Sequence, residues 1–564
     1  MKINNNILLE VNNLCISTAS KNNVKSLVKN ISFNIRKNEI IGLLGESGSG
    51  KSLTSLAILK LLNKDQFKVS GEILFQEKDL LKIEDYKMLK IRGAEISMIF
   101  QEPMSALNPT MKIGKQISEV YKIHQAKSNF NIQKKIKQLI KKVKLEKVEN
   151  ILQKYPHEIS GGQKQRVMII MALACKPKLL IADEPTTALD LTVQKEIIKI
   201  LQSLQKTENL SILFISHDLK LVSKIAHRLI ILKDGEIIEK GVSKDIFKTP
   251  KSNYTKALLS LIINHKRRPK ILPTIKTFDI NKKPELQNNV NRLKRQKDIY
   301  SKEPILKISN VSKFYNTSTN LFVKNKGYKA LENVDLNLYA GETLGLIGES
   351  GSGKSTLSNA ILKIHSFEEG KIYYEGKDIS ILRGKDLLSF KKQVQIIFQD
   401  PYTSLNPMKN IQQTISEPIK YHRLILEKKE ILEKVIELLN DVGLDETFLS
   451  RYPHELSGGQ RQRVCIARAI SLKPKIIICD ECVSALDVSV QATILNLLNS
   501  LKNKYNFTYM FISHDLSVVR YMSDRIVVLF KGKIVEYEEA DKLFSEPKND
   551  YTKKLIKSST LLCL

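Results

Sequence analysis

An internal repeat restricts how this chain can fold more than any other feature of the sequence. The segment GESGSGKS begins at Gly45 and again at Gly348, and FISHDL begins at Phe214 and again at Phe511. Between these motifs, YPHEISGGQKQR of the first half returns as YPHELSGGQRQR in the second. A spacing of roughly 300 residues indicates two copies of a whole domain, because solenoid repeats have periods of about 20 to 50 residues.

The stretch between the two copies reads as a linker. It is rich in Lys and Arg, lacks apolar periodicity and contains Pro269, Pro273 and Pro284. Prolines at this spacing disfavour a long helix, so the sequence predicts a solvated tether. The predicted organisation is a first domain at 1–263, a basic linker at 264–303 and a second domain at 304–564.

The charge balance is unusual, with 91 Lys and Arg residues against 59 Asp and Glu residues and a formal net charge of +32. Such an excess suggests nucleic acid, a membrane surface or phosphates as a partner, unless it reflects a lysine-rich proteome. The excess is spread over residues 112–154 and the linker. It is not gathered in a groove with interleaved aromatic side chains, so we expect no nucleic-acid partner and favour compositional bias, with some attraction to anionic lipid.

Membrane and disulfide signals are weak. No apolar run approaches the roughly 18 residues of a spanning helix, and the N-terminus lacks the pattern of a secretory signal. Six cysteines in 564 residues are too few for a disulfide framework. The sequence therefore predicts a protein of the reducing cytoplasm whose membrane role, if it has one, comes through a partner.

The repeated GESGSGKS matches the phosphate-binding loop G-x-x-x-x-G-K-[ST]. A strand pattern precedes it and a helix pattern follows it, so the glycines can turn backbone N–H groups towards phosphates at a helix N-terminus. The lysine would reach the β- and γ-phosphates of ATP, and the next hydroxyl would bind Mg²⁺. The predicted nucleotide-binding residues are Gly45, Glu46, Ser47, Gly48, Ser49, Gly50, Lys51 and Ser52, then Gly348, Glu349, Ser350, Gly351, Ser352, Gly353, Lys354, Ser355 and Thr356.

Paired carboxylates follow an apolar run in each copy. LLIA precedes Asp183 and Glu184, and IIIC precedes Asp480 and Glu481. A continuous apolar run is typical of a strand buried on both faces of a parallel sheet, and such sheets bind ligands at their C-terminal ends. We expect each aspartate to hold Mg²⁺ and each glutamate to polarise an attacking water. The alternative is that the acids only cap a helix.

A third motif, SGGQ, lies 23 residues before the paired acids in each copy. Taken alone it could be a simple helix cap. In this series it resembles the signature of the ATP-binding-cassette ATPases, and the resemblance covers nearly the whole chain outside the linker. In that family two cassettes pair head to tail, and each ATP lies between the phosphate loop of one and SGGQ of the other. The corresponding residues here are Ser160, Gly161, Gly162 and Gln163, then Ser457, Gly458, Gly459 and Gln460.

The resemblance implies an α/β fold of two P-loop cassettes. Each would have a mainly parallel sheet core, an antiparallel β subdomain and a helical subdomain. It also implies catalytic roles for Gln101 and Gln399, which would touch Mg²⁺ and the attacking water, and for His217 and His514, which would hold the γ-phosphate. A lone histidine is more often an ordinary core or surface residue. The implied Mg²⁺ ligands are Ser52, Gln101, Asp183, Ser355, Gln399 and Asp480.

Three other positions follow from the same resemblance. Asp190 and Asp487 match a loop that communicates between the two sites. Tyr315 matches the aromatic residue that stacks on adenine, whereas the first copy has Thr18 at the equivalent position. Stacking at the first site is therefore expected to be weaker or to come from another residue.

Two departures from the family pattern remove no reacting group. Cys482 replaces the usual proline after the second glutamate, and Lys164 replaces a common arginine after SGGQ. Cys479 and Cys482 also form a C-x-x-C, but without a second pair this is a weak signal for redox or zinc chemistry. We therefore predict two hydrolytically competent sites.

Three classes of cassette protein compete for the function: a membrane importer, a soluble ribosome-binding translation factor and a DNA-repair ATPase. The proline-broken linker is a poor match to the long charged helix of the ribosomal class, and the zinc-binding cysteines of the repair class are absent from the sequence. QxPxxxLNP, YPHE and the tail P-x-x-x-YT-x-x-L resemble the ATPases of oligopeptide/dipeptide, nickel, microcin-C-type and glutathione importers. A lone cysteine in the tail argues against an iron–sulfur centre.

The importer resemblance implies partners and a location. We expect two transmembrane permease subunits, docked near residues 101–117 and 399–415, and a periplasmic or surface peptide-binding protein that acts indirectly. The chain would then lie peripherally on the cytoplasmic face of the inner (plasma) membrane. The cargo cannot be read from the sequence, because cargo contacts belong to the permeases and the binding protein.

Overall fold

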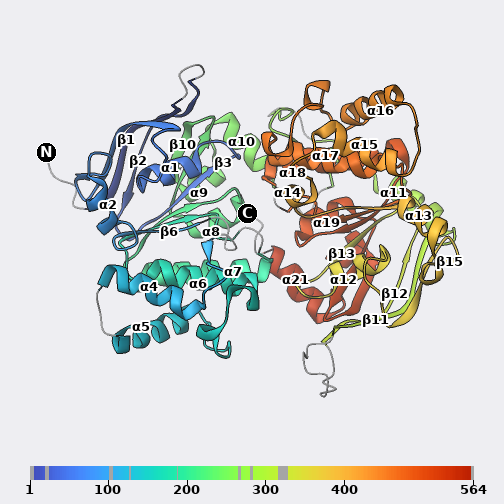
Figure 1. Cartoon of the computed structure of the whole chain (residues 1–564), viewed down its shortest axis with the longest axis horizontal. Coiled ribbons are helices and arrows are strands. Elements are labelled where there is room, and N and C mark those ends of the chain that lie inside the picture. The colour runs from blue at the N-terminus through green and yellow to red at the C-terminus, as the bar shows by residue number, and fades with distance from the viewer. Residues whose placement is uncertain are drawn as a thin grey trace. The chain divides into compact units, whose positions relative to one another are not determined.

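The computed structural model describes residues 6–19, 24–100, 106–125, 129–186, 189–263, 268–279, 284–315, 328–484 and 486–560. The chain divides into two compact units, Met1–Ile262 and Ile263–Cys563 (Figure 1). Each unit contains a six-stranded sheet, a four-stranded sheet and surrounding helices. Both units therefore have the predicted cassette architecture.

The first unit is built on a six-stranded sheet in the order β10-β9-β3-β8-β7-β6. Its strands are parallel except for β10, which pairs antiparallel with β9. A second, antiparallel sheet has the order β2-β1-β4-β5. The strands are β1 (Ile7–Thr18), β2 (Ser26–Arg36), β3 (Ile40–Gly45), β4 (Phe67–Phe75), β5 (Lys78–Asp79), β6 (Ile96–Ile99), β7 (Leu179–Asp183), β8 (Ser211–Ile215), β9 (Arg228–Lys233) and β10 (Glu236–Val242).

Helices of the first unit connect and cover these strands. Helices α4, α5 and α6 pack on one another as the predicted helical subdomain. The helices are α1 (Lys51–Ile58), α2 (Asp85–Ile91), α4 (Ile113–Gln125), α5 (Asn129–Lys142), α6 (Gly161–Leu173), α7 (Leu191–Thr207), α8 (Leu219–Ile225), α9 (Ser243–Lys248) and α10 (Asn253–Ser260), with 3₁₀ turns η1 (Ile151–Gln153) and η2 (Pro156–Glu158).

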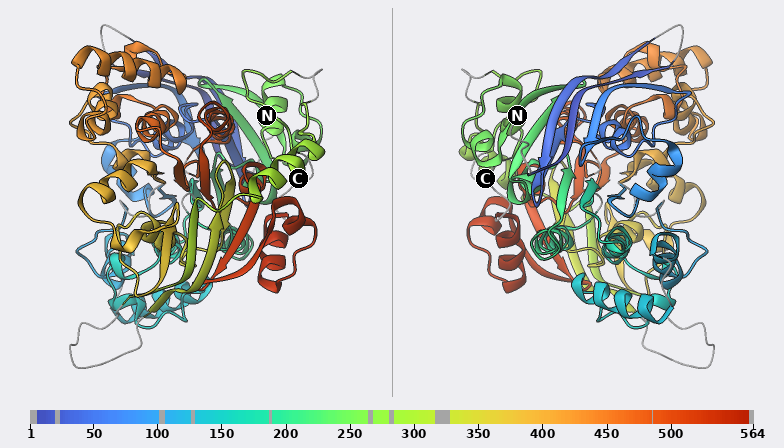
Figure 2. Two further views of the ribbon diagram at one scale, coloured as in Figure 1. Left: turned by 90° about the vertical axis from the view of Figure 1, so that its right-hand side faces the viewer. Right: turned by 90° about the vertical axis from the view of Figure 1, so that its left-hand side faces the viewer.

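The second unit repeats this plan, with sheet orders β16-β17-β18-β13-β19-β20 and β12-β11-β14-β15. Figure 2 draws the ribbon from two further sides. Its strands are β11 (Leu306–Tyr315), β12 (Tyr328–Leu338), β13 (Thr343–Ile347), β14 (Glu369–Tyr374), β15 (Lys377–Asp378), β16 (Val394–Ile397), β17 (Ile476–Asp480), β18 (Thr508–Ile512), β19 (Arg525–Phe530) and β20 (Lys533–Glu539). Its α-helices are α11 (Asn289–Tyr300), α12 (Lys354–Ile361), α13 (Gly384–Gln393), α14 (Pro401–Ser404), α15 (Ile411–Tyr421), α16 (Lys428–Asp441), α17 (Gly458–Ile470), α18 (Val488–Tyr505), α19 (Leu516–Met522), α20 (Ala540–Ser545) and α21 (Asp550–Thr560). Its 3₁₀ turns are η3 (Ile379–Ile381), η4 (Glu446–Phe448) and η5 (Pro453–Glu455).

The central strands are apolar runs because both faces of each six-stranded sheet are buried. Every residue of β3, β7 and β8 is buried in the first unit, as is every residue of β13 and β18 in the second. The antiparallel sheet of each unit packs its apolar face on the same core. This packing fixes the strand ends from which the functional loops leave.

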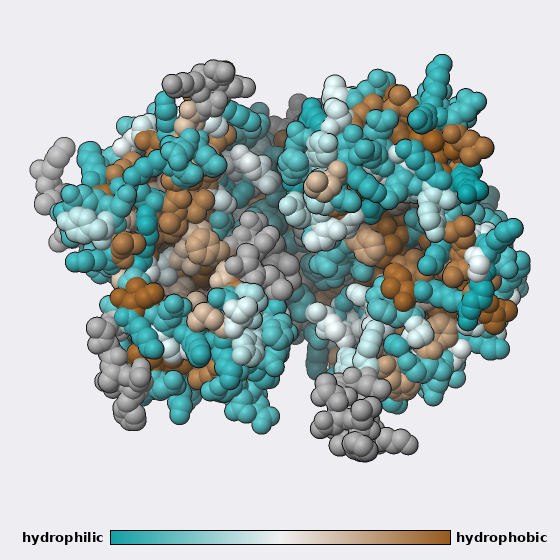
Figure 3. Space-filling view, viewed as in Figure 1, coloured by the Kyte–Doolittle hydropathy of each residue, from teal (hydrophilic) through white to brown (hydrophobic). Residues whose placement is uncertain are grey.

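The visible surface is mostly hydrophilic, with small separate groups of hydrophobic residues (Figure 3). Among the helices that the structure describes, none has the combination of length and apolar character that crossing a membrane requires.

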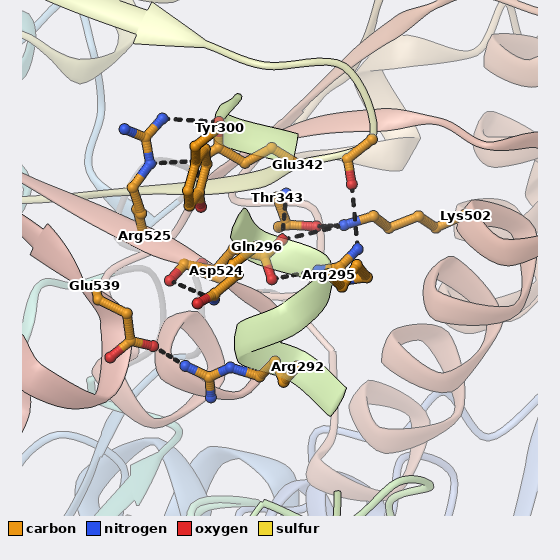
Figure 4. A network of polar contacts seen from close by, with 12 residues as sticks. Arg292, Arg295, Gln296, Tyr300, Glu342, Thr343, Lys502, Asp524, Arg525 and Glu539 are labelled. Atoms are coloured by element: carbon orange, nitrogen blue, oxygen red, sulfur yellow. Dashed lines mark hydrogen bonds and ion pairs between the residues drawn. The ribbon is translucent and has the colours of Figure 1, made fainter. Parts of the chain in front are cut away.

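The linker differs from the sequence expectation of a solvated tether. Its described part packs on the second unit and includes the 12-residue helix α11. Leu272 is buried and exchanges two 2.9 Å hydrogen bonds with the side chain of Asn496. On α11, Gln296 is buried and Arg295 forms an ion pair with Asp524 (Figure 4). The expectation was wrong because acidic partners of the basic linker lie far away in the sequence.

Those acidic partners belong to the second unit alone. Arg292 forms ion pairs with Glu539 and Asp541, beside the Arg295–Asp524 pair. The residue before strand β19 is Asp524, whereas the residue before the corresponding strand β9 is His227. The second copy therefore carries a docking surface for the linker that the first copy lacks.

Candidate functional site

The phosphate loop of each unit runs from the end of a central strand into a helix. Gly50 has φ of 100° and Gly353 has φ of 109°, a left-handed conformation that favours glycine. Lys51 Nζ donates to the carbonyl oxygens of Gly45 and Glu46, both at 2.8 Å. The loop therefore folds around its own lysine.

The second phosphate loop has the same geometry. Lys354 Nζ donates to the carbonyl oxygens of Gly348 at 2.8 Å and Glu349 at 3.0 Å. Each lysine is largely buried and emerges at the first residue of its helix, α1 or α12. A phosphate held by the loop would therefore meet the lysine, backbone N–H groups and the positive end of a helix dipole.

The aspartate at the end of β7 has the character of a cation ligand. Asp183 is buried, and its Oδ1 atom has no hydrogen-bond partner among the described residues. Burial and the charge of Glu184 raise the pKa of Asp183 to about 6, although a hydrogen bond from Ser52 and the charge of Lys51 oppose the change. A buried carboxylate beside a serine hydroxyl, with one oxygen unsatisfied, fits an octahedral oxygen-ligand site for Mg²⁺.

The aspartate of the second unit behaves similarly. Burial, together with the charge of Glu481, raises the pKa of Asp480 to about 6, against the opposing charge of Lys354. Asp480 ends strand β17 as Asp183 ends β7. The residues present in both units thus fit a bound cation, as expected from the paired acids.

The glutamate after each aspartate has an unusual backbone. Glu184 has φ of 47° and Glu481 has φ of 49°, a region that costs energy for residues other than glycine. His217 Nδ1 lies 2.9 Å from Glu184 Oε1, and His514 Nδ1 lies 3.4 Å from Glu481 Oε2. The left-handed turn directs each glutamate towards its histidine, which follows the neighbouring strand of the sheet.

His514 helps to keep Glu481 ionised. Burial alone would raise the pKa of Glu481, but the hydrogen bond from His514 and the charges of His514 and Lys354 lower it overall. Burial would lower the pKa of His514, yet Glu481 raises it above its usual value. The pair therefore favours an ionised glutamate, which is the state that a general base requires.

The SGGQ residues open helix α6 in the first unit and α17 in the second. The side chain of Ser160 accepts from the Gln163 N–H at 3.4 Å, and the Gln163 side chain accepts from the Ser160 N–H at 3.1 Å. Ser457 and Gln460 form the same capping box. The motif is thus a helix cap in both units, and a further role would add to that structural one.

The remaining predicted residues are placed as follows. Gln399 is exposed just after strand β16, whereas Gln101 lies outside the described residues. Tyr315 ends β11 with 38% of its surface exposed, and Lys313 Nζ lies 5.3 Å from its ring centre. Thr18 ends β1 and accepts a hydrogen bond from the Lys25 N–H at 2.9 Å.

Within each unit, the phosphate loop, the paired acids and the histidine meet at the C-terminal ends of adjacent central strands.

The two aspartates of the communicating loop each directly precede a helix. Asp190 caps helix α7, and its side chain accepts from the N–H groups of Thr192 and Val193. Asp487 precedes α18.

One contact of each phosphate loop was not predicted by the sequence analysis. Tyr254 of α10 donates to Glu46 at 2.9 Å, and Tyr551 of α21 accepts from the Glu349 N–H at 3.0 Å. Both tyrosines belong to the tail P-x-x-x-YT-x-x-L, whose duplication was the available signal. Spacing alone could not place that tail on the phosphate loop.

Comparison with known proteins gives consistent matches. The profile of the family described as "ABC transporter" matches residues 28–187 and 331–484. A second profile, "Oligopeptide/dipeptide transporter, C-terminal region", matches residues 238–287 and 535–562. The glutathione import ATP-binding protein GsiA of Escherichia coli O157:H7 is 40% identical over 97% of this chain and 89% of its own length. The protein of the same name from Shigella dysenteriae serotype 1 matches to the same extent.

Some solved structures of single cassettes each match a little under half of this chain. An ATP-binding cassette in a dimeric, post-hydrolysis state bound to ADP and Pi is 31% identical, with a TM-score of 0.38. The match covers 42% of this chain and 98% of that one. The protein cbiO1 of Clostridium perfringens, part of the ABC transporter complex cbiONQ, is 28% identical with a TM-score of 0.39, and the match covers 43% of this chain and 92% of that one.

Proposed function

The chain belongs to the ABC transporter family, and we propose that it hydrolyses ATP at two sites to power an importer of glutathione or other small peptides. The observation that carries the proposal is the duplicated constellation of loop lysine, paired acids and histidine, followed in each copy by the importer-type tail. The relatives' names supply the cargo class. The earlier alternative, a soluble ATPase acting on the ribosome, has no support among these relatives.

The residues of each unit divide the chemistry among them. Lys51 and Lys354 bind the β- and γ-phosphates together with the loop N–H groups. Glu184 and Glu481 accept a proton from the attacking water, and His217 and His514, each beside its glutamate, hold the γ-phosphate. These groups are preorganised, so little reorganisation is needed as charge develops in the transition state.

The cation would be held by carboxylate, hydroxyl and amide oxygens of each unit. We propose Ser52, Gln101 and Asp183 in the first unit, and Ser355, Gln399 and Asp480 in the second. When bound, Mg²⁺ neutralises charge on the β- and γ-phosphate oxygens. Cation binding is expected to restore full ionisation of the two buried aspartates.

We further propose that SGGQ of each copy contacts the nucleotide held by the phosphate loop of the other copy. The two glycines of the second motif offer a matched test. A Cβ atom on Gly458 would find its nearest contact in Leu486 at 3.8 Å, whereas a Cβ atom on Gly459 would meet Val490 at 2.5 Å. Alanine therefore fits at Gly458 within its own unit but not at Gly459.

The variant Gly458→Ala is expected to fold normally and to lose ATPase activity by about tenfold or more, because its methyl group would intrude on the nucleotide bound by the first copy. Circular dichroism and thermal unfolding check the fold, and phosphate release measures the activity. Unchanged activity in Gly458→Ala would show that the motif only caps its helix. Gly459→Ala serves as the control that destabilises the unit directly.

The proposed partners are two permease subunits that dock near residues 101–117 and 399–415, with a peptide-binding protein acting on the outer side. The chain would lie on the cytoplasmic face of the plasma membrane. Affinity purification of the chain from solubilised membranes tests this: permease subunits are the expected companions. Recovery of ribosomes without permeases would contradict the proposal.

A further inference from the structure

Each unit carries a tail after its last strand, and the tail ends in a helix with a tyrosine. Glutamates on the last strands anchor the turn before that helix. Glu239 of β10 accepts from the N–H groups of Lys251 at 2.9 Å and Ser252 at 3.1 Å. Glu536 of β20 accepts from the two corresponding N–H groups at 2.8 and 3.0 Å. The tail is therefore fixed to the sheet just before its tyrosine.

The tyrosine hydroxyl lies on the second residue of the phosphate loop in both units. Tyr254 donates to the Glu46 carboxylate at 2.9 Å. The Tyr551 hydroxyl accepts from the Glu349 backbone N–H at 3.0 Å. The tyrosine thus contacts the second loop residue in both units, through the Glu46 carboxylate in the first and the Glu349 N–H in the second, each time across more than 200 positions of the chain.

Packing holds each tyrosine ring in place. Tyr254 is 8% exposed, and Lys233 Nζ lies 5.0 Å from its ring centre. The ring of Tyr551 packs on Phe530 with 4.1 Å between centroids. Burial and the charge of Glu46 raise the pKa of Tyr254 well above its usual value, so this phenol stays protonated near neutral pH.

The contact reaches the loop lysine through one peptide group. The N–H of Glu46 and the carbonyl of Gly45 belong to the same planar unit. Tyr254 holds the side chain of Glu46, while the Gly45 carbonyl accepts from Lys51 Nζ at 2.8 Å. In the second unit, the peptide between Gly348 and Glu349 donates its N–H to Tyr551, and its carbonyl accepts from Lys354 Nζ.

We propose that Tyr254 and Tyr551 are positioning residues for nucleotide binding, because each fixes the loop residue whose preceding carbonyl holds the loop lysine in place. This inference rests on the proposed nucleotide sites. Without the phenol oxygen the peptide can rotate, and the loop must then be ordered when the phosphates bind. The cost is expected to fall on nucleotide affinity, because the tyrosine acts on the loop that binds the phosphates.

The test uses Tyr254→Phe and Tyr551→Phe in the full-length chain, since phenylalanine keeps the ring and removes only the hydroxyl. Equilibrium binding of a fluorescent ATP analogue with Mg²⁺ is measured in a Glu184→Gln, Glu481→Gln background that binds but does not hydrolyse. Each substitution is expected to weaken one of the two binding sites about three- to tenfold. In chains with intact glutamates, KM for ATP is expected to rise by a similar factor while kcat changes less than about twofold.

Tyr86→Phe and Tyr373→Phe are the matched controls, because neither hydroxyl lies on a phosphate loop. Thermal unfolding without nucleotide should be unchanged in all four variants. Affinity and KM equal to wild type in both test variants would overturn the inference, as would equal losses caused by lower stability without nucleotide. If the parent chain bound no ATP analogue at all, the proposed function itself would fail, which is a distinct result.

Discussion

Replacing both Glu184 and Glu481 with glutamine is expected to reduce steady-state ATPase activity by about a hundredfold or more. Glutamine keeps the size of the side chain but cannot accept the proton of the attacking water, and general-base catalysis typically contributes 10²- to 10⁴-fold. Each glutamate meets its histidine from a left-handed backbone, so the amide will occupy nearly the same position. Phosphate release at saturating ATP is the measurement.

The single variants test whether both sites turn over. Glu184→Gln and Glu481→Gln should each reduce activity on its own, and full activity in either one would contradict the two-site claim. Glu77→Gln is a suitable control, because Glu77 also has positive φ, at 69°, but is exposed and lies outside the site. Binding of ATP should survive in all these variants.

The second large effect is expected at Asp524, where the linker docks on the second unit (Figure 4). Its carboxylate pairs with Arg295 and with Lys502 at 3.5 Å, and accepts from the Thr343 N–H at 2.9 Å. Asp524→Ala would leave two cations without their shared partner, which typically costs about 3–5 kcal/mol. Thr343 begins β13, the strand that leads into the phosphate loop. Urea unfolding should therefore show a less stable second unit, with faster amide exchange in α11 and β13.

The pH dependence of this effect has a definite sign. Burial alone would raise the pKa of Asp524, but the charges of Lys502 and Arg295 lower it well below its usual value. A depressed carboxyl pKa adds stability that is fully present above the unfolded value of about 3.9 and is lost as the pH falls towards the folded value. The difference between wild type and Asp524→Ala should therefore persist from pH 5 to 8 and shrink below about pH 4.

Asp550→Ala is the control for removing an acidic group of the second unit. Asp550 is largely exposed and pairs with Lys553 at 3.3 Å. Exposed pairs of this kind contribute about 0–1 kcal/mol. Equal stability of Asp524→Ala and Asp550→Ala would show that the linker contact is not a structural part of the second unit.

The sequence was most informative where chemistry demands a fixed local pattern. The phosphate loop must curl around Lys51 within eight residues, so its glycines and its serine are readable without a structure. The buried strand before Asp183 is equally clear, because a strand covered on both faces must be apolar along its length. These short-range requirements are why the cassette fold could be predicted from the motifs.

The features that escaped prediction depend on contacts between distant segments. Prolines before α11 suggested a tether, yet Arg295 finds Asp524 more than 200 positions later. The same applies to Tyr254, which reaches Glu46 across a comparable separation. A linear pattern records that such residues are present but not which surface they meet.

The most direct test of the account is uptake of labelled glutathione and labelled di- and oligopeptides by cells. A strain lacking this chain, but retaining the permeases and binding protein, is compared with strains given the wild-type chain or the Glu184→Gln, Glu481→Gln variant. We predict that only the wild-type chain restores uptake of at least one of these cargoes, with the inactive variant present at equal abundance in the membrane fraction. Equal uptake of every cargo in all three strains would contradict the claim that ATP hydrolysis by this chain drives peptide import.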